Sequence, residues 1–222
     1  MISQYYESDK SFDSLKNSKL EIEELQKSNS DYWYLNSKDY PGWIWKDDIF
    51  NDLEINHIRM IGQALCMERA ETGGSGADCL DHRRSMVSWI PINEHTSWIY
   101  EKITDHIRLV NDRWFNFDLD KIERLQFTHY NSNENGCYKA HTDPLNWRVP
   151  HNRKLSIVIQ LSDPSEYEGG ELILHNSHEN NVVEKGKGYT VFFPSYTLHE
   201  VTPVTKGERF TLVGWIHGNA FK

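Results

Sequence analysis

Two potential metal ligands, His141 and Asp143, are separated by a single residue in the second half of the chain. On a β-strand, residues two positions apart point to the same face, so one metal ion would receive an imidazole nitrogen and a carboxylate oxygen. His199 is the natural third ligand, because it follows the apolar run Thr190–Pro194, which suits a strand returning beside the first. A His-x-Asp pair is common by chance, so the prediction depends on the residues that accompany it.

Two histidines and one carboxylate on one face leave half of an octahedral metal's positions open, which is the facial triad of non-haem iron(II) oxygenases. Arg209 follows His199 within the strand-like run Arg209-Phe-Thr-Leu-Val. A guanidinium holds a carboxylate through two parallel hydrogen bonds, which an enzyme with a dicarboxylic co-substrate needs. Thr211 shares the strand face of Arg209 and would support the same carboxylate. The order His-x-Asp, His and Arg therefore predicts iron chemistry that uses a dicarboxylate.

Length and charge limit the classes of protein to consider. The chain has 222 residues and a formal net charge of −9. This length suits one hydrophobic core and is not clearly enough for two, so we expect a single domain over residues 1–222. Its 8 Trp, 11 Tyr and 9 Phe provide many large side chains for a hydrophobic core. Because non-specific binding to nucleic acids depends on basic surface, the acidic balance argues against a nucleic-acid partner.

The sequence contains no signal for a membrane or for export. No apolar run approaches the ~18 residues of a transmembrane helix, and residues 1–10 are polar and acidic, unlike a signal peptide. Cys66, Cys79 and Cys137 lack the spacing of a zinc site and do not indicate a disulfide framework. We therefore expect a cytoplasmic protein with no membrane partner, and the sequence leaves its oligomeric state open.

Helices are predicted in the first half of the chain. Residues 1–30 favour a polar N-terminal arm or a short helix, and the sequence does not decide between them. Asp48–Leu65 and Ser97–Val110 have apolar residues at helical spacing. Between these helices, Glu71–Gly76 is expected to be a flexible loop and Arg84–Ile90 favours a strand.

From residue 122 onward, short alternating or β-branched runs are separated by Gly, Pro and Asn, which indicates a sandwich or barrel of short strands. The expected strands are Arg124–Tyr130, Lys154–Leu161, Glu171–Leu174, Tyr189–Phe193 and Phe210–Trp215. Together with the helices that precede them, they predict an α+β fold. Its mainly β core would occupy about residues 120–218, with flanking N-terminal helices packed on a double sheet.

The motifs between residues 84 and 215 occur together and in order. The stretches concerned are Phe127–Tyr130, Gly136–Pro144, Leu155–Leu161, Glu168–Leu172, Gly188–Pro194, His199–Pro203 and Gly207–Trp215. In these stretches the chain resembles the 2-oxoglutarate and Fe(II)-dependent dioxygenase superfamily, in its prolyl 4-hydroxylase-like branch. The stretch Tyr167–Leu172 is most similar to the bacterial and phage-type prolyl/lysyl hydroxylase-like members.

The resemblance implies a double-stranded β-helix, or jelly roll, and assigns iron(II) to His141, Asp143 and His199. It implies that Arg209 binds the distal carboxylate of 2-oxoglutarate, with O₂ as the second co-substrate and ascorbate as an accessory reductant. The implied reaction hydroxylates an unactivated C–H bond of a prolyl or peptidyl substrate and releases succinate and CO₂. A free amino acid or a small metabolite remains open as the substrate.

Further positions match the site of this family. Tyr130 corresponds to a tyrosine whose hydroxyl helps hold the co-substrate, and Tyr138 corresponds to a second tyrosine that lines the site. Trp215 corresponds to a bulky aromatic residue on the strand of Arg209. These matches imply that both tyrosines contribute to co-substrate binding and that Tyr138 and Trp215 also wall the substrate pocket.

Other candidates for the substrate pocket are less specific. Gln160 stands where several relatives have a tyrosine, which leaves open whether it bonds a ligand or is structural. Trp147 would either wall the pocket or simply pack against the core. Residues 148–153 and the Glu71–Gly76 loop are the expected covers of the bound substrate.

Three other functions fit the sequence less well. An AlkB-like nucleic-acid demethylase typically has a second arginine where this chain has Trp215, and the net charge is acidic. A catalytically silent jelly-roll binding module would not need every ligand position filled. A metal-dependent hydrolase or a cupin-type isomerase would not need Arg209 as a clamp for a dicarboxylate.

Overall fold

The computed structural model describes residues 41–70, 81–143, 152–175 and 180–219. The chain divides into residues 1–39 and residues 40–222, and the description that follows concerns the second part. The predicted arm over residues 1–30, the Glu71–Gly76 loop, Cys79 and Trp147 lie outside the described residues. The single domain over residues 1–222 therefore stays a prediction.

Two helices, α2 (Asp52–Ala64) and α4 (Ser97–Val110), confirm the predicted helices. A capping box starts α2: the Asn51 side chain accepts from the Glu54 backbone N–H, and the Glu54 side chain accepts from the Asn51 N–H. The apolar residues recur on one face of each helix, as an amphipathic helix requires. Buried residues on these faces are Ile55 and Ile58 of α2 and Ile99, Ile103, Ile107 and Val110 of α4.

A single π-helical turn, η2 (Asn111–Phe115), continues α4 without a break. It ends at Asn116, whose φ of 52° is left-handed. The Asn111 side-chain amide then clamps the following segment, because its Nδ2 donates to the Phe117 carbonyl and its Oδ1 accepts from the Phe117 N–H, both at 2.9 Å. This clamp directs the chain into strand β5 (Leu119–Ile122).

The strands of the described residues form two antiparallel sheets. The larger sheet has the order β1 (Ile44–Lys46), β12 (Thr190–Pro194), β8 (Asn152–Gln160), β14 (Val204–Gly218), β6 (Gln126–Asn131), β4 (Met86–Trp89) and β2 (Glu68–Arg69). β5 and β9 (Tyr167–Gly169) also pair with β14. The smaller sheet has the order β11 (Asn180–Val182), β10 (Leu172–His175), β13 (His199–Val201), β7 (Cys137–His141) and β3 (Arg83–Arg84). Short 3₁₀ turns form η3 (Ser132–Glu134) and η4 (Pro164–Glu166).

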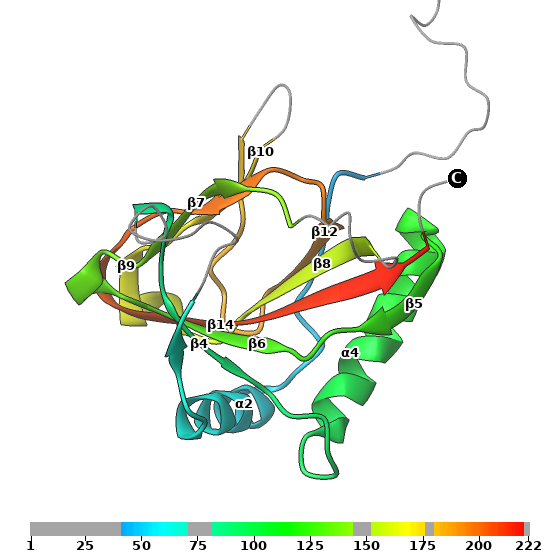
Figure 1. Cartoon of the computed structure of the whole chain (residues 1–222), viewed down its shortest axis with the longest axis horizontal. Coiled ribbons are helices and arrows are strands. Elements are labelled where there is room, and N and C mark those ends of the chain that lie inside the picture. Colours follow the sequence, from blue (N-terminus) through cyan, green and yellow to red (C-terminus); the bar gives the residue numbers. More distant parts are fainter. Residues whose placement is uncertain (1–40, 71–80, 144–151, 176–179, 220–222) are drawn as a thin grey trace, which may run out of the picture. The chain divides into compact units, whose positions relative to one another are not determined.

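The mainly β fold with flanking helices is therefore confirmed, and every predicted strand overlaps an observed one. Figure 1 shows α2 and α4 on one side of the larger sheet, with β7 and β10 of the smaller sheet on the other side. Within the described residues, no helix is both long enough and apolar enough to span a lipid bilayer.

Strand β8 separates two hydrophobic cores. Leu155, Ile157 and Ile159 are fully buried in the core shared with α2 and α4. Val158 points the other way, into a smaller core shared with the second sheet. Because side chains alternate along a strand, Ser156 and Gln160 must also face the space between the sheets. That space holds the polar side chains described next.

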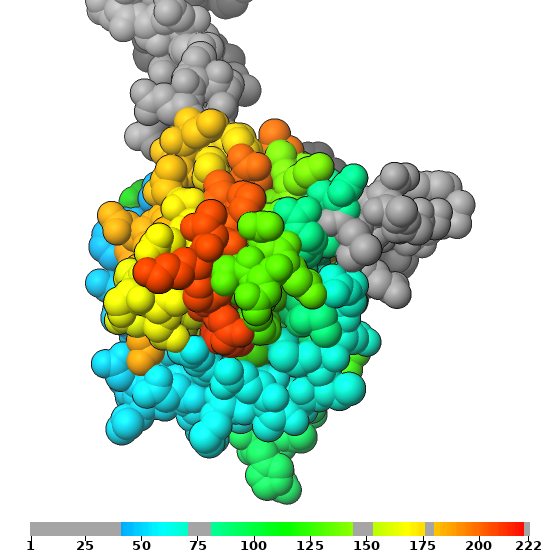
Figure 2. Space-filling model, turned by 90° about the vertical axis from the view of Figure 1, so that its left-hand side faces the viewer, coloured from blue at the N-terminus to red at the C-terminus, as the bar shows by residue number. Residues whose placement is uncertain are grey.

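The start of β14 lies at the surface of one end of the molecule. Figure 2 shows this orange-red segment between the yellow segment that includes η4 and β9 and the green segment that includes η3. Thr205, Lys206 and Glu208 are exposed there, whereas Arg209, the next residue along the strand, is 1 % exposed. The strand therefore runs from the surface into the interior, and Arg209 is the first residue of this segment that is buried after the exposed Glu208.

Candidate active site

Neighbouring strands of the smaller sheet bring the three predicted ligands together. β7 ends at His141, β13 begins at His199, and these two residues are paired in register. Asp143 lies just beyond the end of β7, and its backbone N–H donates to the Ser195 carbonyl at 2.9 Å. Potential ligand atoms of the three side chains lie within 4.8 Å of one another. The Asp143 carboxylate is 3.7 Å from His141 Nε2 and 3.6 Å from His199 Nε2.

Backbone carbonyls fix which ring nitrogen of each histidine is free. His141 Nδ1 is 2.8 Å from the Lys139 carbonyl, and His199 Nδ1 is 2.9 Å from the Thr197 carbonyl. Each Nδ1–H is therefore the donor, and each Nε2 keeps a lone pair for a metal. Burial and the nearby His199 lower the pKa of His141 to about 4. His141 is consequently neutral near pH 7, as a metal ligand must be.

Two serines support the carboxylate of Asp143. Ser156 Oγ donates to Asp143 Oδ2 at 2.7 Å and lies 2.9 Å from Ser195 Oγ. All three side chains are buried. No lysine or arginine of the described residues forms an ion pair with Asp143. Two imidazole nitrogens and one carboxylate oxygen that converge in this way fit Fe(II).

Arg209 is a buried cation without a carboxylate partner among the described residues. Its Nη2 donates to Gln160 Oε1 at 3.0 Å, and its Nε, also buried, has no hydrogen-bond partner there. Its guanidinium carbon lies 5.3 Å from the centre of the Tyr130 ring, and Tyr130 is its partner across the sheet. A buried charge of this kind is costly unless an anion joins it. The surroundings of Arg209 therefore fit a carboxylate ligand.

One cavity connects the metal ligands with Arg209. Its lining includes the three ligands and Arg209, together with Tyr130, Tyr138, Thr211 and Trp215 of the predicted site. Gln160 does not line it and instead lies behind Arg209, which it bonds. The structure thus brings together the predicted metal and carboxylate sites, while Trp147 lies outside the described residues.

Two tightly held aromatic residues also line this cavity. The Tyr138 ring stacks on the His141 imidazole with 3.4 Å between centroids, and burial raises the pKa of its hydroxyl. Trp215 is buried, and its Nε1–H has no partner among the described residues. The Arg153 guanidinium lies 3.9 Å from the centre of the Trp215 ring and bonds both carboxylate oxygens of Glu123, at 2.6 and 2.8 Å. Trp215 is therefore clamped with its indole N–H still available.

Sequence reasoning missed Arg83, a second buried arginine in the cavity lining. Its Nε donates to Ser85 Oγ at 2.9 Å and its Nη2 donates to Gln126 Oε1 at 2.8 Å. Its guanidinium carbon lies 4.5 Å from the centre of the Tyr138 ring. No signal in the sequence distinguished Arg83 from its neighbour Arg84, because only the strand direction determines which of the two points inward.

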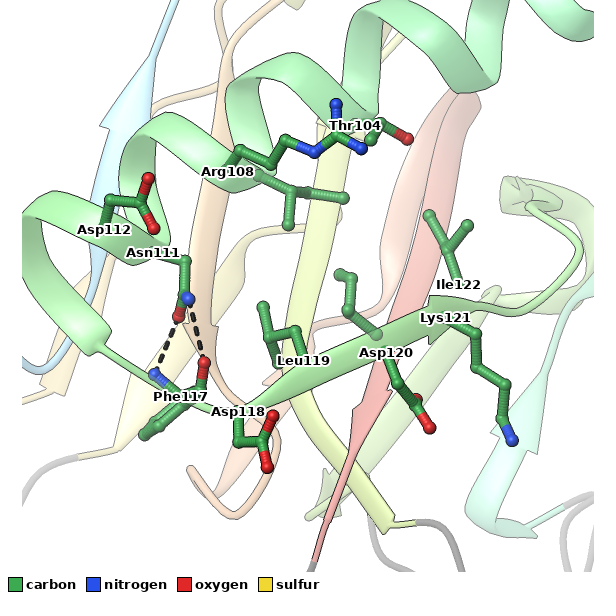
Figure 3. Close-up of a pocket in the computed structure, with 12 residues that line it drawn as sticks. Thr104, Arg108, Asn111, Asp112, Phe117, Asp118, Leu119, Asp120, Lys121 and Ile122 are labelled. Carbon is green, nitrogen blue, oxygen red and sulfur yellow. Dashed lines mark hydrogen bonds between the residues drawn. The ribbon is translucent and has the colours of Figure 1, made fainter.

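A second, larger hollow lies elsewhere, between α4, η2 and β5 (Figure 3). Its volume is about 430 Å³, and it combines apolar residues with Arg108, Lys121 and several aspartates. Among the described residues, the only cluster of potential metal ligands is the His141, Asp143 and His199 group, which does not border this hollow. The smaller cavity between the sheets is therefore the candidate active site.

Comparison with known protein sequences supports the resemblance described above. Residues 125–217 match the profile of the family described as "2OG-Fe(II) oxygenase superfamily". A PKHD-type hydroxylase of Shewanella frigidimarina is 35% identical over 95 residues, which is 40% of this chain and 41% of that protein. The chain thus spans about two fifths of the length of the curated relatives it matches first.

Solved structures share the fold over most of the chain. A prolyl-4-hydroxylase of Pseudomonas putida superimposes with a TM-score of 0.63 at 22% identity, covering 81% of this chain and 94% of that one. A prolyl hydroxylase of Trichoplax adhaerens, in complex with a hypoxia inducible factor oxygen degradation domain peptide fragment, gives a TM-score of 0.66 at 16% identity. That match covers 80% of this chain and 84% of the other. At these identities, the likeness establishes the fold alone.

Proposed function

We propose that this chain, whose residues 125–217 match the profile of the 2OG-Fe(II) oxygenase superfamily, is a 2-oxoglutarate- and iron(II)-dependent dioxygenase that hydroxylates an unactivated C–H bond. One observation carries the proposal: the His141, Asp143 and His199 ligand atoms converge within 4.8 Å in a cavity that also contains the buried Arg209, which has no carboxylate partner among the described residues. Bound iron would couple O₂ activation to the decarboxylation of 2-oxoglutarate, with succinate and CO₂ as products.

Each residue around the metal has a defined task in this proposal. His141 and His199 supply Nε2 lone pairs, because both Nδ1 atoms face backbone carbonyls. Asp143 supplies a negative charge, and Ser156 holds one of its oxygens at 2.7 Å so that the carboxylate cannot rotate freely. Such supporting hydrogen bonds orient the ligands before the metal arrives.

The opposite end of the cavity would hold the distal carboxylate of 2-oxoglutarate. Arg209 supplies the charge and Gln160 orients its guanidinium from behind. The hydroxyl-bearing side chains of Tyr130 and Thr211 line the cavity beside it. Pairing with the carboxylate would satisfy the Arg209 charge, which has no carboxylate partner among the described residues.

We further propose a peptidyl substrate with a prolyl residue. Two related folds are named as prolyl hydroxylases, and one of them was solved with a peptide. In this chain, the Trp215 Nε1–H is a buried donor without a partner among the described residues, and it borders the cavity. A peptide carbonyl would accept that hydrogen bond, while the Tyr138 ring would form another wall.

A specific observation favours a second substrate class, a free amino acid or another small carboxylate. Arg83 lines the cavity, is 6 % exposed and has only neutral hydrogen-bond partners among the described residues. A substrate carboxylate would compensate its charge, as 2-oxoglutarate would compensate that of Arg209. An internal prolyl residue of a peptide carries no such group.

The first test is anaerobic titration of the protein with Fe(II) and 2-oxoglutarate, followed by visible absorption. The expected result is a weak metal-to-ligand charge-transfer band that is lost in His199→Ala and weakened in Arg209→Ala. His175→Ala is a matched control, because His175 lies in the same sheet but pairs with Asn180 and Glu200. A folded wild-type protein that binds iron without this band would contradict the proposal.

The second test separates the two substrate classes. Succinate release would be measured with a prolyl peptide whose ends are blocked, with free proline and with other free amino acids. Stimulation by the blocked peptide alone supports the peptidyl substrate. Stimulation that requires a free carboxylate and is lost in Arg83→Met supports the small-carboxylate substrate instead.

A further inference from the structure

The hollow between α4, η2 and β5 is separate from the cavity that contains the metal ligands. The two have no lining residue in common. Ile216 lines the hollow, whereas its neighbour Trp215 lines the other cavity, because successive side chains of β14 point to opposite faces. The volume of the hollow, about 430 Å³, lies within the range of ~300–1,000 Å³ that is usual for small-molecule sites. The hollow therefore has room for a ligand of its own.

One end of the hollow is formed by the π-helical turn η2. The Asn116 N–H donates to the Asn111 carbonyl, five positions back, at 2.7 Å. Turns of this kind interrupt α-helices and occur frequently at functional sites. The hydrogen bonds between the Asn111 side chain and the Phe117 backbone, dashed in Figure 3, hold the start of β5 against this turn. This end of the hollow is therefore held in place by its own hydrogen bonds.

Four aliphatic side chains line the hollow. Ile107 of α4 and Ile216 of β14 are buried, whereas Leu119 and Ile122 of β5 are only half-buried. The apolar surface that these two residues of β5 leave exposed would be covered by an apolar ligand, and removing such surface from water is favourable. The lining therefore favours a ligand with an apolar middle part.

Charges of opposite sign lie toward the two ends of the hollow. Figure 3 shows the Arg108 guanidinium extending along α4 to Thr104, while Asp112 and Asp118 lie toward the opposite end, near the π turn. One oxygen of Asp118 accepts from Asn219 Nδ2 at 2.7 Å. A ligand with only a negative charge would meet the two carboxylates, and one with only a positive charge would meet Arg108. The arrangement therefore favours a ligand with a negative charge at one end and a positive charge at the other.

The remaining charges around the hollow do not alter this preference. Arg108 lies 3.7 Å from Asp105, but the two side chains are 74% and 76% exposed, and exposed pairs of this kind contribute little. Asp120 and Lys121 also line the hollow, and Figure 3 shows both side chains pointing away from α4. Their charges are opposite, so together they add no net charge to this edge of the hollow.

The separation of the charged ends sets the length of the ligand. Thr104, which the Arg108 guanidinium reaches, and Asp112 are eight positions apart. At ~1.5 Å per residue, this separation is about 12 Å along a helix. An extended peptide spans about 3.3–3.6 Å per residue, so a peptide of about two or three residues would reach between the two ends.

We propose that this hollow binds a short peptide with free termini and apolar side chains. Its carboxylate pairs with Arg108, and its ammonium group pairs with Asp112 and Asp118. Its side chains cover the exposed surface of Leu119 and Ile122. The site takes no part in the proposed oxygenase chemistry, and its ligand is not the substrate.

The test is isothermal titration calorimetry of the full chain with the tripeptide alanyl-leucyl-alanine, whose two ends are free. Saturable binding to one site is expected. The N-acetylated and C-amidated forms of the tripeptide each lose one charge, and each is expected to bind about tenfold more weakly. Free leucine carries both charges but is too short to reach both ends, so it is also expected to bind more weakly than the tripeptide.

Matched variants locate the binding site. Arg108→Gln and Asp112→Asn are each expected to weaken binding of the free tripeptide by about tenfold. Arg108→Gln should also abolish the difference between the free and C-amidated tripeptides, because both changes remove the same pair. Glu101→Gln is the control, since Glu101 is an exposed residue of α4 that does not line the hollow. Arg83→Met changes the other cavity and should leave tripeptide binding intact. Circular dichroism verifies the fold of each variant.

The outcomes separate this site from the candidate active site. Tripeptide binding that weakens in Arg108→Gln and Asp112→Asn but not in Glu101→Gln or Arg83→Met would support the proposal. Absence of binding to the folded wild-type chain would overturn it. Equal binding of the free and blocked tripeptides would overturn it as well, as would binding that is lost only in Arg83→Met. Each of these results leaves the proposed oxygenase function standing, because that function is tested by the charge-transfer band.

Discussion

Removing the Ser156 hydroxyl is expected to weaken iron binding without unfolding the protein. Ser156 Oγ donates to Asp143 Oδ2 at 2.7 Å, and both side chains are buried. A hydrogen bond to a charged group contributes about 1.5–3 kcal/mol. Loss of a partner that orients a metal ligand typically lowers metal affinity by about 10- to 100-fold, which corresponds to a similar free energy. We therefore expect Ser156→Ala to raise the dissociation constant for Fe(II) by about 10- to 100-fold.

The assay is anaerobic titration with Fe(II), with circular dichroism to verify the fold. Ser162→Ala is the matched control: Ser162 is equally buried just beyond β8, but its hydroxyl bonds Phe210 and Glu208 backbone atoms rather than a ligand. Ser156→Thr keeps a hydroxyl and should retain most of the affinity. If Ser156→Ala binds Fe(II) within about twofold of wild type, less than ~0.5 kcal/mol, the orienting role of Ser156 is wrong.

Three further predictions concern other parts of the site. Gln160→Leu should raise the KM for 2-oxoglutarate while Fe(II) affinity stays unchanged, because Gln160 bonds Arg209 and no metal ligand. Gly170→Ala should lower the free energy of unfolding by about 1–2 kcal/mol, measured by thermal denaturation, because Gly170 has φ +62°. The same change should raise the KM for 2-oxoglutarate, because a Cβ at Gly170 would lie 3.0 Å from Arg209 Cδ. The third prediction concerns Glu123. Burial alone would raise the pKa of its carboxyl group, but Arg153 and His217 together lower this pKa below its usual 4.5. The stability from Glu123 should therefore be complete above pH 4.5 and fall at lower pH, and Glu123→Gln should flatten this part of the denaturation profile.

Local patterns in the sequence were enough to predict the two helices and several of the strands. Ser97–Val110 was predicted with both of its observed ends, because its apolar residues keep helical spacing throughout. The strand predictions also overlap observed strands, since β-branched runs between turn residues are a local signal. The π-helical turn at Asn111–Phe115 was not predicted, because it depends on the clamp between the Asn111 side chain and the Phe117 backbone.

The candidate site was predictable only where its residues form a motif. His141, Asp143, His199 and Arg209 follow a recognisable order, and the structure places all four around one cavity. The expected strand geometry was only partly right, because β7 ends at His141 and Asp143 is held instead by the Ser195 carbonyl. That contact joins residues distant in sequence, and no local pattern reports it.

The supporting residues could nevertheless be found from the way apolar and polar side chains alternate along β8 and β14. In β8, Leu155, Ile157 and Ile159 face the helices, so a polar residue between them must face the space between the sheets. Ser156 and Gln160 occupy such positions, and each bonds a residue of the candidate site.

The side chains of β14 alternate between two faces in the same way. Phe210 and Leu212 lie in the helix-side core, while Arg209, Thr211 and Trp215 line the cavity. A slip of one residue in either strand would bury the polar set against the helices and empty the site. The register of these two strands therefore couples the stability of the fold to the assembly of the site. A polar residue at an alternate position of an otherwise apolar strand is the signal by which Ser156 could have been found.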